Sequence, residues 1–320
     1  MDKINFSFVV TGRNDNYGGN MINRASTFVK VLYFLLDKYK IRSEIVFVEY
    51  NPVSDKKYLF QEIPIPNTSF VTLRGIVVPT EFHDRVKKNK IPLLEYYGKN
   101  IGIRRAQGEY IIATNPDIIF SEEIIRRFAT DILDTNHFYR ADRYEIASNY
   151  FDPKIRPEDI LEICRKDIIK ILYSPRTHYK SYKHWVKRLP HGLRNILMCP
   201  ALNMFYPPDR KSLYENASGD FLLAHRDIYS RAHGYDQAPH NLHHDSLMLH
   251  VLKALGYEQK ILMEPIYHIN HLEGRAGRPG VEYAKYREVA DQMDKTGIPI
   301  INNDQDWGFA SENFEEIIIK

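Results

Sequence analysis

The chain has 320 residues, 43% of them hydrophobic and 27% charged, and its 44 basic and 41 acidic residues leave a formal net charge of +3. This composition is typical of a soluble globular protein, and so small a charge does not predict nucleic-acid binding. Two cysteines, Cys164 and Cys199, exclude a disulfide framework and a cysteine zinc site. No run approaches the roughly 20 apolar residues of a membrane span, and the segment MDKINFSFVV lacks a signal-peptide pattern, so we expect a cytoplasmic protein without a membrane span.

The first part of the chain predicts alternating strands and helices. Residues 4–10 and 43–50 are apolar runs typical of strands, and a third strand is expected near residues 70–73. Residues 21–39 repeat apolar side chains at the spacing of a helix that buries one face. This order predicts half of a Rossmann-like α/β sheet, although the GxGxxG fingerprint of a dinucleotide site is absent.

Polar residues follow the first two strands. The segment TGRND (residues 11–15) comes after the first strand, and Glu49 stands at the end of the second. A polar, glycine-containing loop at this place in an α/β sheet is a common contact for a nucleotide. Glu49 is equally well explained as a charge at the end of a strand.

The segment YIIATNPDIIF, residues 110–120, predicts a buried central strand that ends abruptly. Pro116 has no N–H to donate, and Asp117 follows at the edge of the sheet where α/β proteins bind ligands. Ser121, followed by two glutamates, predicts the N-cap of a helix that runs to about residue 133. An aspartate in a turn after a strand is also common without any function.

The middle of the chain differs from its flanks. Residues 157–173 have helical periodicity, and residues 178–188 are basic and aromatic together. Such a stretch can contact an acidic or sugar-bearing acceptor, but a solvated surface helix is the commoner explanation. We therefore expect a helical insertion here.

The last third of the chain returns to strands and helices. Residues 221–225 predict a strand and residues 226–232 a short helix, and His243-His244-Asp245 precedes a helix that ends at Gly256. Two more strands are expected at residues 259–263 and 266–271. The tail predicts one further helix, at residues 281–293.

Four segments together resemble glycosyltransferases of the GT-A fold, the family-2-like transferases and their relatives. They read FSFVVTGRND, KNIGIRRAQGEYIIATNPD, GDFLLAHRDIYSRAHGYD and HHDSLMLHVLKALGYEQKILMEPIYHINH. The resemblance implies an α/β fold with a mixed, mainly parallel central sheet flanked by helices, a helical insertion and a C-terminal helical tail. It implies one catalytic domain with a nucleotide-binding half (1–135), the insertion (136–216), an acceptor half (217–275) and the tail (276–320).

The family's activity implies roles for particular residues. The resemblance implies that a sugar passes from a nucleoside diphosphate sugar, of the UDP type, to a glycan or other hydroxyl acceptor such as a protein, with Mn²⁺ or Mg²⁺ bound by Asp117 and His271. Asp245 is the candidate general base. The residues expected around the nucleotide sugar are Thr11, Gly12, Arg13, Asp15, Glu49, Asn100, Arg105, Asn115 and Asp220.

Two positions depart from the family pattern. Asn115 stands where the metal motif usually has a first acidic residue, and His244 replaces one member of the acidic pair at the catalytic motif. Asp245 is then the single carboxylate there, and a charge in the first turn of a helix also explains it. Arg105 is likewise explained as a residue on the surface of a helix.

The segment YHINH resembles a His-x-x-His run of polypeptide N-acetylgalactosaminyltransferases, in which the second histidine binds the metal. On an extended strand, residues three apart face opposite sides. We therefore expect His271 to bind the metal and His268 to face the core or a neighbouring helix.

Two other functions compete with the transferase. A sugar-phosphate nucleotidyltransferase can share this kind of sheet, but it needs a phosphate loop of which TGRNDNYGG is a poor version. A non-catalytic glycan- or nucleotide-binding module with a decayed site is suggested by Asn115 and His244.

Overall fold

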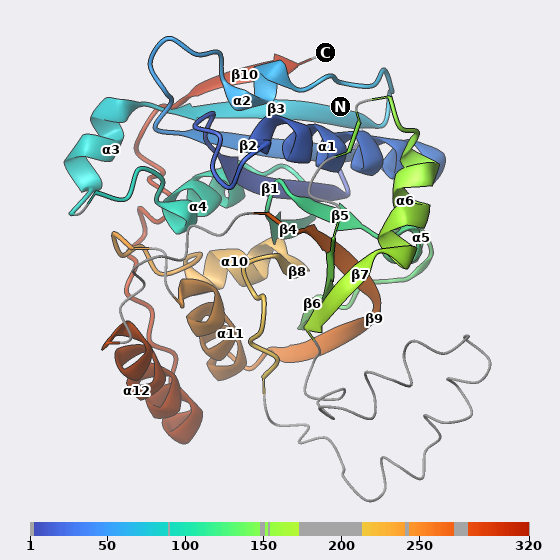
Figure 1. The fold of residues 1–320 in the computed structure, drawn as a ribbon. Coiled ribbons are helices and arrows are strands. Elements are labelled where there is room, and N and C mark those ends of the chain that lie inside the picture. The colour runs from blue at the N-terminus through green and yellow to red at the C-terminus, as the bar shows by residue number, and fades with distance from the viewer. Residues whose placement is uncertain are drawn as a thin grey trace, which may run out of the picture.

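A ten-stranded mixed sheet forms the centre of the computed structural model, in the order β10-β3-β2-β1-β4-β8-β6-β9-β5, with β7 paired to β6. Helices cover both faces of this sheet (Figure 1). The structure describes residues 3–88, 90–147, 151–152, 154–172, 213–240, 243–271 and 281–319. The basic and aromatic residues 178–188 lie outside these ranges.

The strands are β1 (Phe6–Gly12), β2 (Ser43–Tyr50), β3 (Val71–Val78), β4 (Tyr110–Thr114), β5 (Ile118–Phe120), β6 (His137–Ile146), β7 (Ile168–Leu172), β8 (Phe221–His225), β9 (Glu258–Ile269) and β10 (Glu315–Ile319). The helices are α1 (Met21–Lys38), α2 (Leu59–Glu62), α3 (Thr80–Val86), α4 (Glu95–Arg105), α5 (Glu122–Thr130), α6 (Pro157–Lys166), α10 (Arg226–Ala232), α11 (His244–Ala254) and α12 (Val281–Thr296). The α/β class and the mixed sheet, parallel in its core, are as predicted.

The first half of the chain builds the parallel core β3-β2-β1-β4. Every residue of β1 and β2 is buried, as the continuous apolar runs of a sheet covered on both faces require. Alternate side chains of β1 enter different layers: Phe8 and Val10 pack with α1 and α5, whereas Val9 packs with α4 and α11. The carboxyl ends of these four strands therefore share one edge.

Several elements differ from the sequence prediction. The helix expected over residues 157–173 ends at Lys166, and residues 168–172 form β7 against β6. Because β6 and β7 belong to the main sheet, residues 136–172 are not a purely helical insertion. The prediction of a helical C-terminal tail is also wrong in part, since β10 follows α12 and pairs antiparallel with β3.

The two strands expected at residues 259–263 and 266–271 are one strand, β9. Its pairing with β6 shifts register between Ala141 and Arg143, at the level of Pro265, which has no N–H for the ladder.

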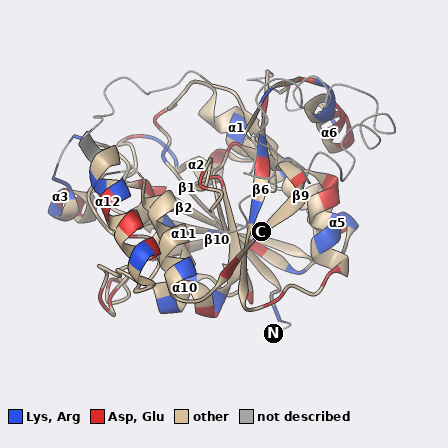
Figure 2. Ribbon diagram, turned by 90° about the horizontal axis from the view of Figure 1, so that it is seen from below, with Lys and Arg blue, Asp and Glu red and all other residues tan. Residues whose placement is uncertain are grey.

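Figure 2 shows charged residues mostly on the outer helices, whereas β6 carries both basic and acidic residues within the sheet. In the described part of the chain, no helix combines the length and the apolar character that crossing a membrane requires.

Candidate active site

Asp117 lies in the turn between β4 and β5, at the carboxyl edge of the parallel core. The turn is closed by a hydrogen bond from the Ile118 N–H to the Asn115 carbonyl at 3.2 Å, and the Ile269 N–H donates to the Asp117 carbonyl at 3.1 Å. Only 7% of Asp117 is exposed. The abrupt strand end at Pro116 thus places a buried carboxylate at this edge, as predicted, while β5 itself was not predicted and pairs with β9.

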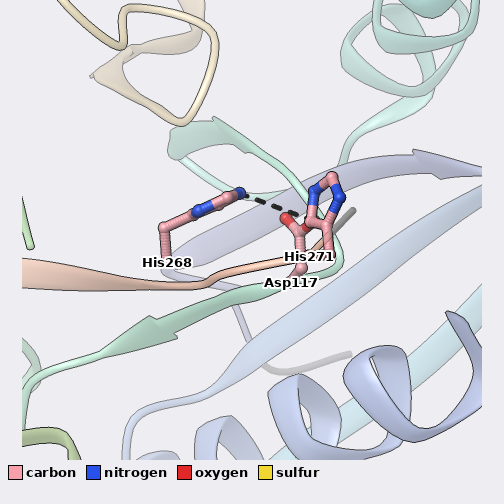
Figure 3. A group of neighbouring side chains, drawn as sticks. All are labelled: Asp117, His268 and His271. Carbon is pink, nitrogen blue, oxygen red and sulfur yellow. Dashed lines mark ion pairs between the residues drawn. The ribbon is translucent and has the colours of Figure 1, made fainter. Parts of the chain in front are cut away.

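Two histidines face this carboxylate (Figure 3). The Nε2 atoms of His271 and His268 lie 3.3 and 3.8 Å from Asp117 Oδ2. The three residues offer ligand atoms that all lie within 4.8 Å of one another, and they form the one such group of His, Cys, Asp and Glu found among the described residues. These three residues could together hold a metal ion, and for this candidate role we call Asp117, His268 and His271 the metal-binding cluster.

The position of His268 corrects the sequence prediction. We expected it in the core because residues three apart face opposite sides of a strand. The strand ends at Ile269, however, so the alternation of a strand does not apply between His268 and His271. Both imidazoles approach the same oxygen of Asp117, with ring centroids 5.3 Å apart.

The metal-binding cluster contains unpaired polar atoms that a divalent cation could satisfy. Asp117 Oδ1 and His268 Nδ1 are both buried and have no hydrogen-bond partner in the described residues. Leaving such a group unpaired costs about 1–3 kcal/mol, which a bound cation at the carboxylate would offset. Burial raises the pKa of Asp117, but His268, His271 and Arg24 outweigh it and hold this pKa well below its usual range. Burial lowers the pKa of His268 and so favours the neutral imidazole that binds metals.

A buried arginine, Arg24 of α1, completes the surroundings of Asp117. Its Nη1 donates to Asp117 Oδ2 at 2.8 Å, and its side chain is 1% exposed. Sequence reasoning missed it, although a signal was present: Arg24 lies on the same helical stripe as the buried Met21 and Phe28. A charged residue on an apolar stripe requires a buried partner.

A second charged group lies beside Asn115, at the start of β8. Asp220, 6% exposed, accepts from Asn115 Nδ2 at 2.8 Å and from the guanidinium of Arg143, which also pairs with Glu145. Burial raises the pKa of Asp220, but Arg143 outweighs it and the pKa is lowered. Asn115 and Asp220 were both predicted site residues, whereas Arg143 and Glu145 were not, and their signal was the charged pattern within β6.

Asp245 lies in the first turn of α11 and supports the turn that carries Asp220. Its Oδ2 accepts hydrogen bonds from Ser218 Oγ at 2.7 Å and from the Gly219 N–H at 2.8 Å. A Cβ on Gly219 would lie 3.0 Å from the hydroxyl of Tyr96, so the turn is closely packed. The structure thus brings Asp245 to the residues next to Asp220.

The loop after β1 is tied to the end of β2. Arg13 Nε donates to the Asn51 carbonyl at 2.5 Å and Nη1 pairs with Asp15 at 2.9 Å. Glu49 is fully buried and accepts from the Asn14 N–H at 3.0 Å. These contacts hold Arg13 and Asp15 at the carboxyl edge of the sheet.

Glu49 also accepts from the Leu59 N–H at 2.7 Å, so both carboxylate oxygens bind backbone donors. Burial raises the pKa of Glu49 to about 7, against the opposing effect of these two hydrogen bonds.

Thr11 and Gly12 belong to β1 and are buried, and a Cβ on Gly12 would meet the Phe47 ring at 2.9 Å. Among the described residues, Thr11 Oγ1 has no hydrogen-bond partner.

Asn100 and Arg105 use their polar groups within the fold. The Asn100 amide donates to the Tyr235 carbonyl at 2.7 Å and accepts from the Tyr235 N–H at 2.8 Å. The Arg105 guanidinium donates at 2.8 Å to the carbonyls of Gly308, Phe309 and Glu312 in the C-terminal segment. Both residues anchor other parts of the chain, and we leave them out of the proposed site.

Comparison with known proteins gives distant structural likenesses. No family model matches the sequence, and no curated protein matches it. The catalytic domain of Drosophila beta1,4galactosyltransferase 7, solved in complex with xylobiose, is similar with a TM-score of 0.42 and 10% identity over 89% of this chain and 79% of that one. TarS 1-349 of S. aureus is similar with a TM-score of 0.47 and 10% identity over 95% of this chain and 68% of that one. At these values the activity of either protein cannot be transferred to this chain.

Proposed function

We propose that this protein is a metal-dependent glycosyltransferase that moves a sugar from a nucleoside diphosphate sugar, of the UDP type, to a hydroxyl of a glycan or protein. The observation that carries the proposal is the metal-binding cluster, with its buried and unpaired Asp117 Oδ1, at the carboxyl edge of the parallel core. The four sequence segments that resemble GT-A transferases include all three residues of this cluster.

Asp117, His268 and His271 would hold the cation. When bound, Mn²⁺ or Mg²⁺ would neutralise the negative charge that develops on the departing diphosphate. Two imidazole ligands favour Mn²⁺ over Mg²⁺, which prefers oxygen.

The strand order supports a site for the nucleotide beside the cluster. The ends of β4, β1, β2 and β3 follow one another along the edge, and three strand spacings amount to roughly 14 Å. This span suits a nucleoside diphosphate with its phosphates at Asp117 and its nucleoside over the loop of Arg13 and Asp15. A cavity of about 360 Å³ at the ends of β2 and β3, lined by residues that include Asn51 and His83, would receive the base.

The sugar and the acceptor would lie on the side of β8. The Asp220 carboxylate can accept hydrogen bonds from sugar hydroxyls, and the Asn115 amide can accept or donate them. Arg143 holds the Asp220 carboxylate in place. Asp245 would take the proton of the acceptor hydroxyl in an inverting transfer. Its bonds to Ser218 and Gly219 both use Oδ2 and fix the orientation of the carboxylate.

The test is to incubate the protein with a panel of UDP-, GDP- and CDP-sugars and Mn²⁺ and to measure free nucleoside diphosphate. A transferase releases the diphosphate, and both a chelator and Asp117→Ala should abolish this release. Asp131→Ala, an exposed aspartate after α5, is the matched control and should leave it unchanged. Formation of pyrophosphate or a sugar phosphate would instead indicate a nucleotidyltransferase, and binding without any product would indicate a non-catalytic module.

A further inference from the structure

One buried guanidinium connects the metal-binding cluster to the loop after β1. Besides its 2.8 Å bond to Asp117 Oδ2, Arg24 donates from Nε to the Gly19 carbonyl at 3.2 Å and from Nη2 to the Tyr17 carbonyl. The rigid fork of an arginine suits this task, because its donors point in fixed directions toward several acceptors at once. Arg24 thus holds a ligand carboxylate and a backbone loop in one geometry.

The same loop touches a second member of the cluster. Gly18 has a positive φ of 68°, and a Cβ at this position would lie 2.5 Å from His271 Nδ1 and 3.0 Å from Arg24 Nη2. The ring of Tyr17 packs edge-on against His271 at 5.7 Å between centroids. Residues 17–19, which we call the glycine loop, are therefore packed between Arg24 and His271.

We propose that Arg24 is a positioning residue that couples the glycine loop to the metal-binding cluster, so that nucleotide binding at the loop and cation binding at Asp117 strengthen each other. The inference rests on the proposed function, because that function places the nucleoside over Arg13 and Asp15, which precede the glycine loop in the segment after β1. Coupling between two sites is reciprocal: whatever the ordered loop adds to cation affinity, the bound cation adds to nucleotide affinity.

Arg24 exerts two effects of opposite sign on the two ligands. Its charge lies next to a ligand carboxylate, so it opposes a second cation there. Its hydrogen bonds to Tyr17 and Gly19 keep the loop in place, so it favours the nucleotide. A residue that only stabilised the fold would have effects of the same sign on both ligands.

The test is calorimetry of Mn²⁺ alone, and of UDP both without Mn²⁺ and at saturating Mn²⁺, on wild type and Arg24→Gln. The ratio of the two UDP affinities measures the coupling, and we expect this ratio to be smaller in Arg24→Gln than in wild type. We expect Arg24→Gln to bind Mn²⁺ about fivefold more tightly and UDP about tenfold more weakly, within the usual range for coupled sites. Arg74→Gln is the matched control, because Arg74 is also buried, pairs with Glu44 and donates to a backbone carbonyl. It should lower the Tm and leave both affinities unchanged.

Arg24→Lys separates the effect of the charge of Arg24 from the effect of its hydrogen-bond geometry. This variant also tests the coupling if Arg24→Gln does not fold. Lysine keeps the charge and loses the fork, so UDP affinity should fall while Mn²⁺ affinity stays as in wild type. Equal weakening of both ligands in Arg24→Gln, or unchanged UDP affinity in Arg24→Lys, overturns the coupling. A wild type that binds no Mn²⁺ overturns the proposed function itself, and the coupling with it.

Discussion

At the scale of the residue, the two carboxylate oxygens of Asp117 differ in their partners. Oδ2 faces Arg24 and both histidines, whereas Oδ1 is buried without a partner in the described residues. A salt bridge alone does not explain this asymmetry, because a buried acceptor left unpaired is a cost to folding. The cation that we propose would supply the missing partner of Oδ1.

Both histidines of the cluster should matter for metal binding. We expect His268→Ala and His271→Ala each to weaken Mn²⁺ binding by at least about tenfold, since changes even to outer partners of metal ligands cost 10- to 100-fold. His225→Ala is the control: it lies opposite Tyr110, at the other end of β4. Titration of each variant with Mn²⁺ measures the effect. If His268→Ala bound Mn²⁺ like wild type, the ion would have only two ligands from this cluster.

Asp245→Asn tests the candidate base. The amide keeps one oxygen for the Gly219 N–H and Ser218, so the turn that carries Asp220 should survive. We expect turnover with acceptor to fall by about 10²- to 10⁴-fold, the usual contribution of a general base, with donor affinity nearly unchanged. Steady-state kinetics together with UDP calorimetry separate the two quantities. A parallel loss of donor affinity would make Asp245 a residue that only supports the Asp220 turn.

The sequence predicted the residues that follow a strand end and missed those that reach the site from elsewhere. Asp117 could be predicted because Pro116 ends β4, and the resemblance to a known family added His271. Arg24 reaches Asp117 across 93 positions of the chain, which no local pattern encodes. His268 was misplaced because its orientation depends on where β9 stops, and strand boundaries depend on tertiary pairing.

At the scale of the element, α4 approaches the sheet closely because its face toward the sheet carries glycines. A Cβ on Gly102 would lie 2.5 Å from Val9 Cγ1 and 3.0 Å from Val48 Cγ2, both in buried strands. Branched side chains fixed in a core have little room to move. This packing aligns α4 over β1 and β2, and with it the loops at the carboxyl edge.

Gly102→Ala should therefore destabilise the fold despite the better helix propensity of alanine. Overpacking costs about 1–3 kcal/mol, against a gain of roughly 1 kcal/mol from removing a glycine inside a helix. Urea denaturation measures the change. In a Val9→Ala background, which removes the clashing methyl groups, the same substitution should be neutral or stabilising. Equal costs in both backgrounds would mean that α4 does not contact β1 at this position.

Elements with local signals were predicted well, and those fixed by distant partners were not. Ser121 accepts a hydrogen bond from the Ile124 N–H at 3.3 Å and begins α5 as its sequence predicted. The strands β5, β7 and β10 are three to five residues long and exist through pairing with β9, β6 and β3. In β7, the apolar run continued the helical pattern of α6, so periodicity alone could not separate the two.

At the scale of the whole molecule, antiparallel pairing folds the second half of the chain onto the edge built by the first. Thr114 of β4 lies opposite Phe221 of β8, which places Asn115 beside Asp220. Ile118 of β5 lies opposite His268 of β9, which places Asp117 beside the histidines. The two halves of the chain therefore meet at one turn, the three residues between β4 and β5.

The free energy of unfolding of the whole fold should change with pH between about 4.5 and 7 because of Glu49. Burial raises its pKa in the folded protein from 4.5 to about 7. In the unfolded chain Glu49 loses its proton above about pH 4.5, whereas in the fold it keeps the proton until about pH 7. The unfolded state thus binds fewer protons in this window, and the stability that Glu49 contributes below pH 4.5 is lost as the pH rises to 7.

Comparison of the wild type with Glu49→Gln isolates this effect. Burial lowers the pKa values of His83 and His268, so these histidines change the stability with pH in the opposite direction. Their contribution is the same in both proteins and cancels in the comparison. In Glu49 both side-chain oxygens accept a hydrogen bond, one from the Asn14 N–H and one from the Leu59 N–H. Glutamine replaces one of these oxygens with an NH₂ group, which cannot accept, so one backbone donor loses its partner. The variant should therefore be less stable than the wild type at pH 5 by about 1–3 kcal/mol. That deficit should shrink between pH 5 and pH 8 by up to about 3 kcal/mol, at about 1.4 kcal/mol per pKa unit. Urea midpoints of both metal-free proteins at each pH give the difference. A deficit that stayed constant with pH would mean that Glu49 is already ionised in the fold at pH 5, and that the two backbone hydrogen bonds outweigh its burial.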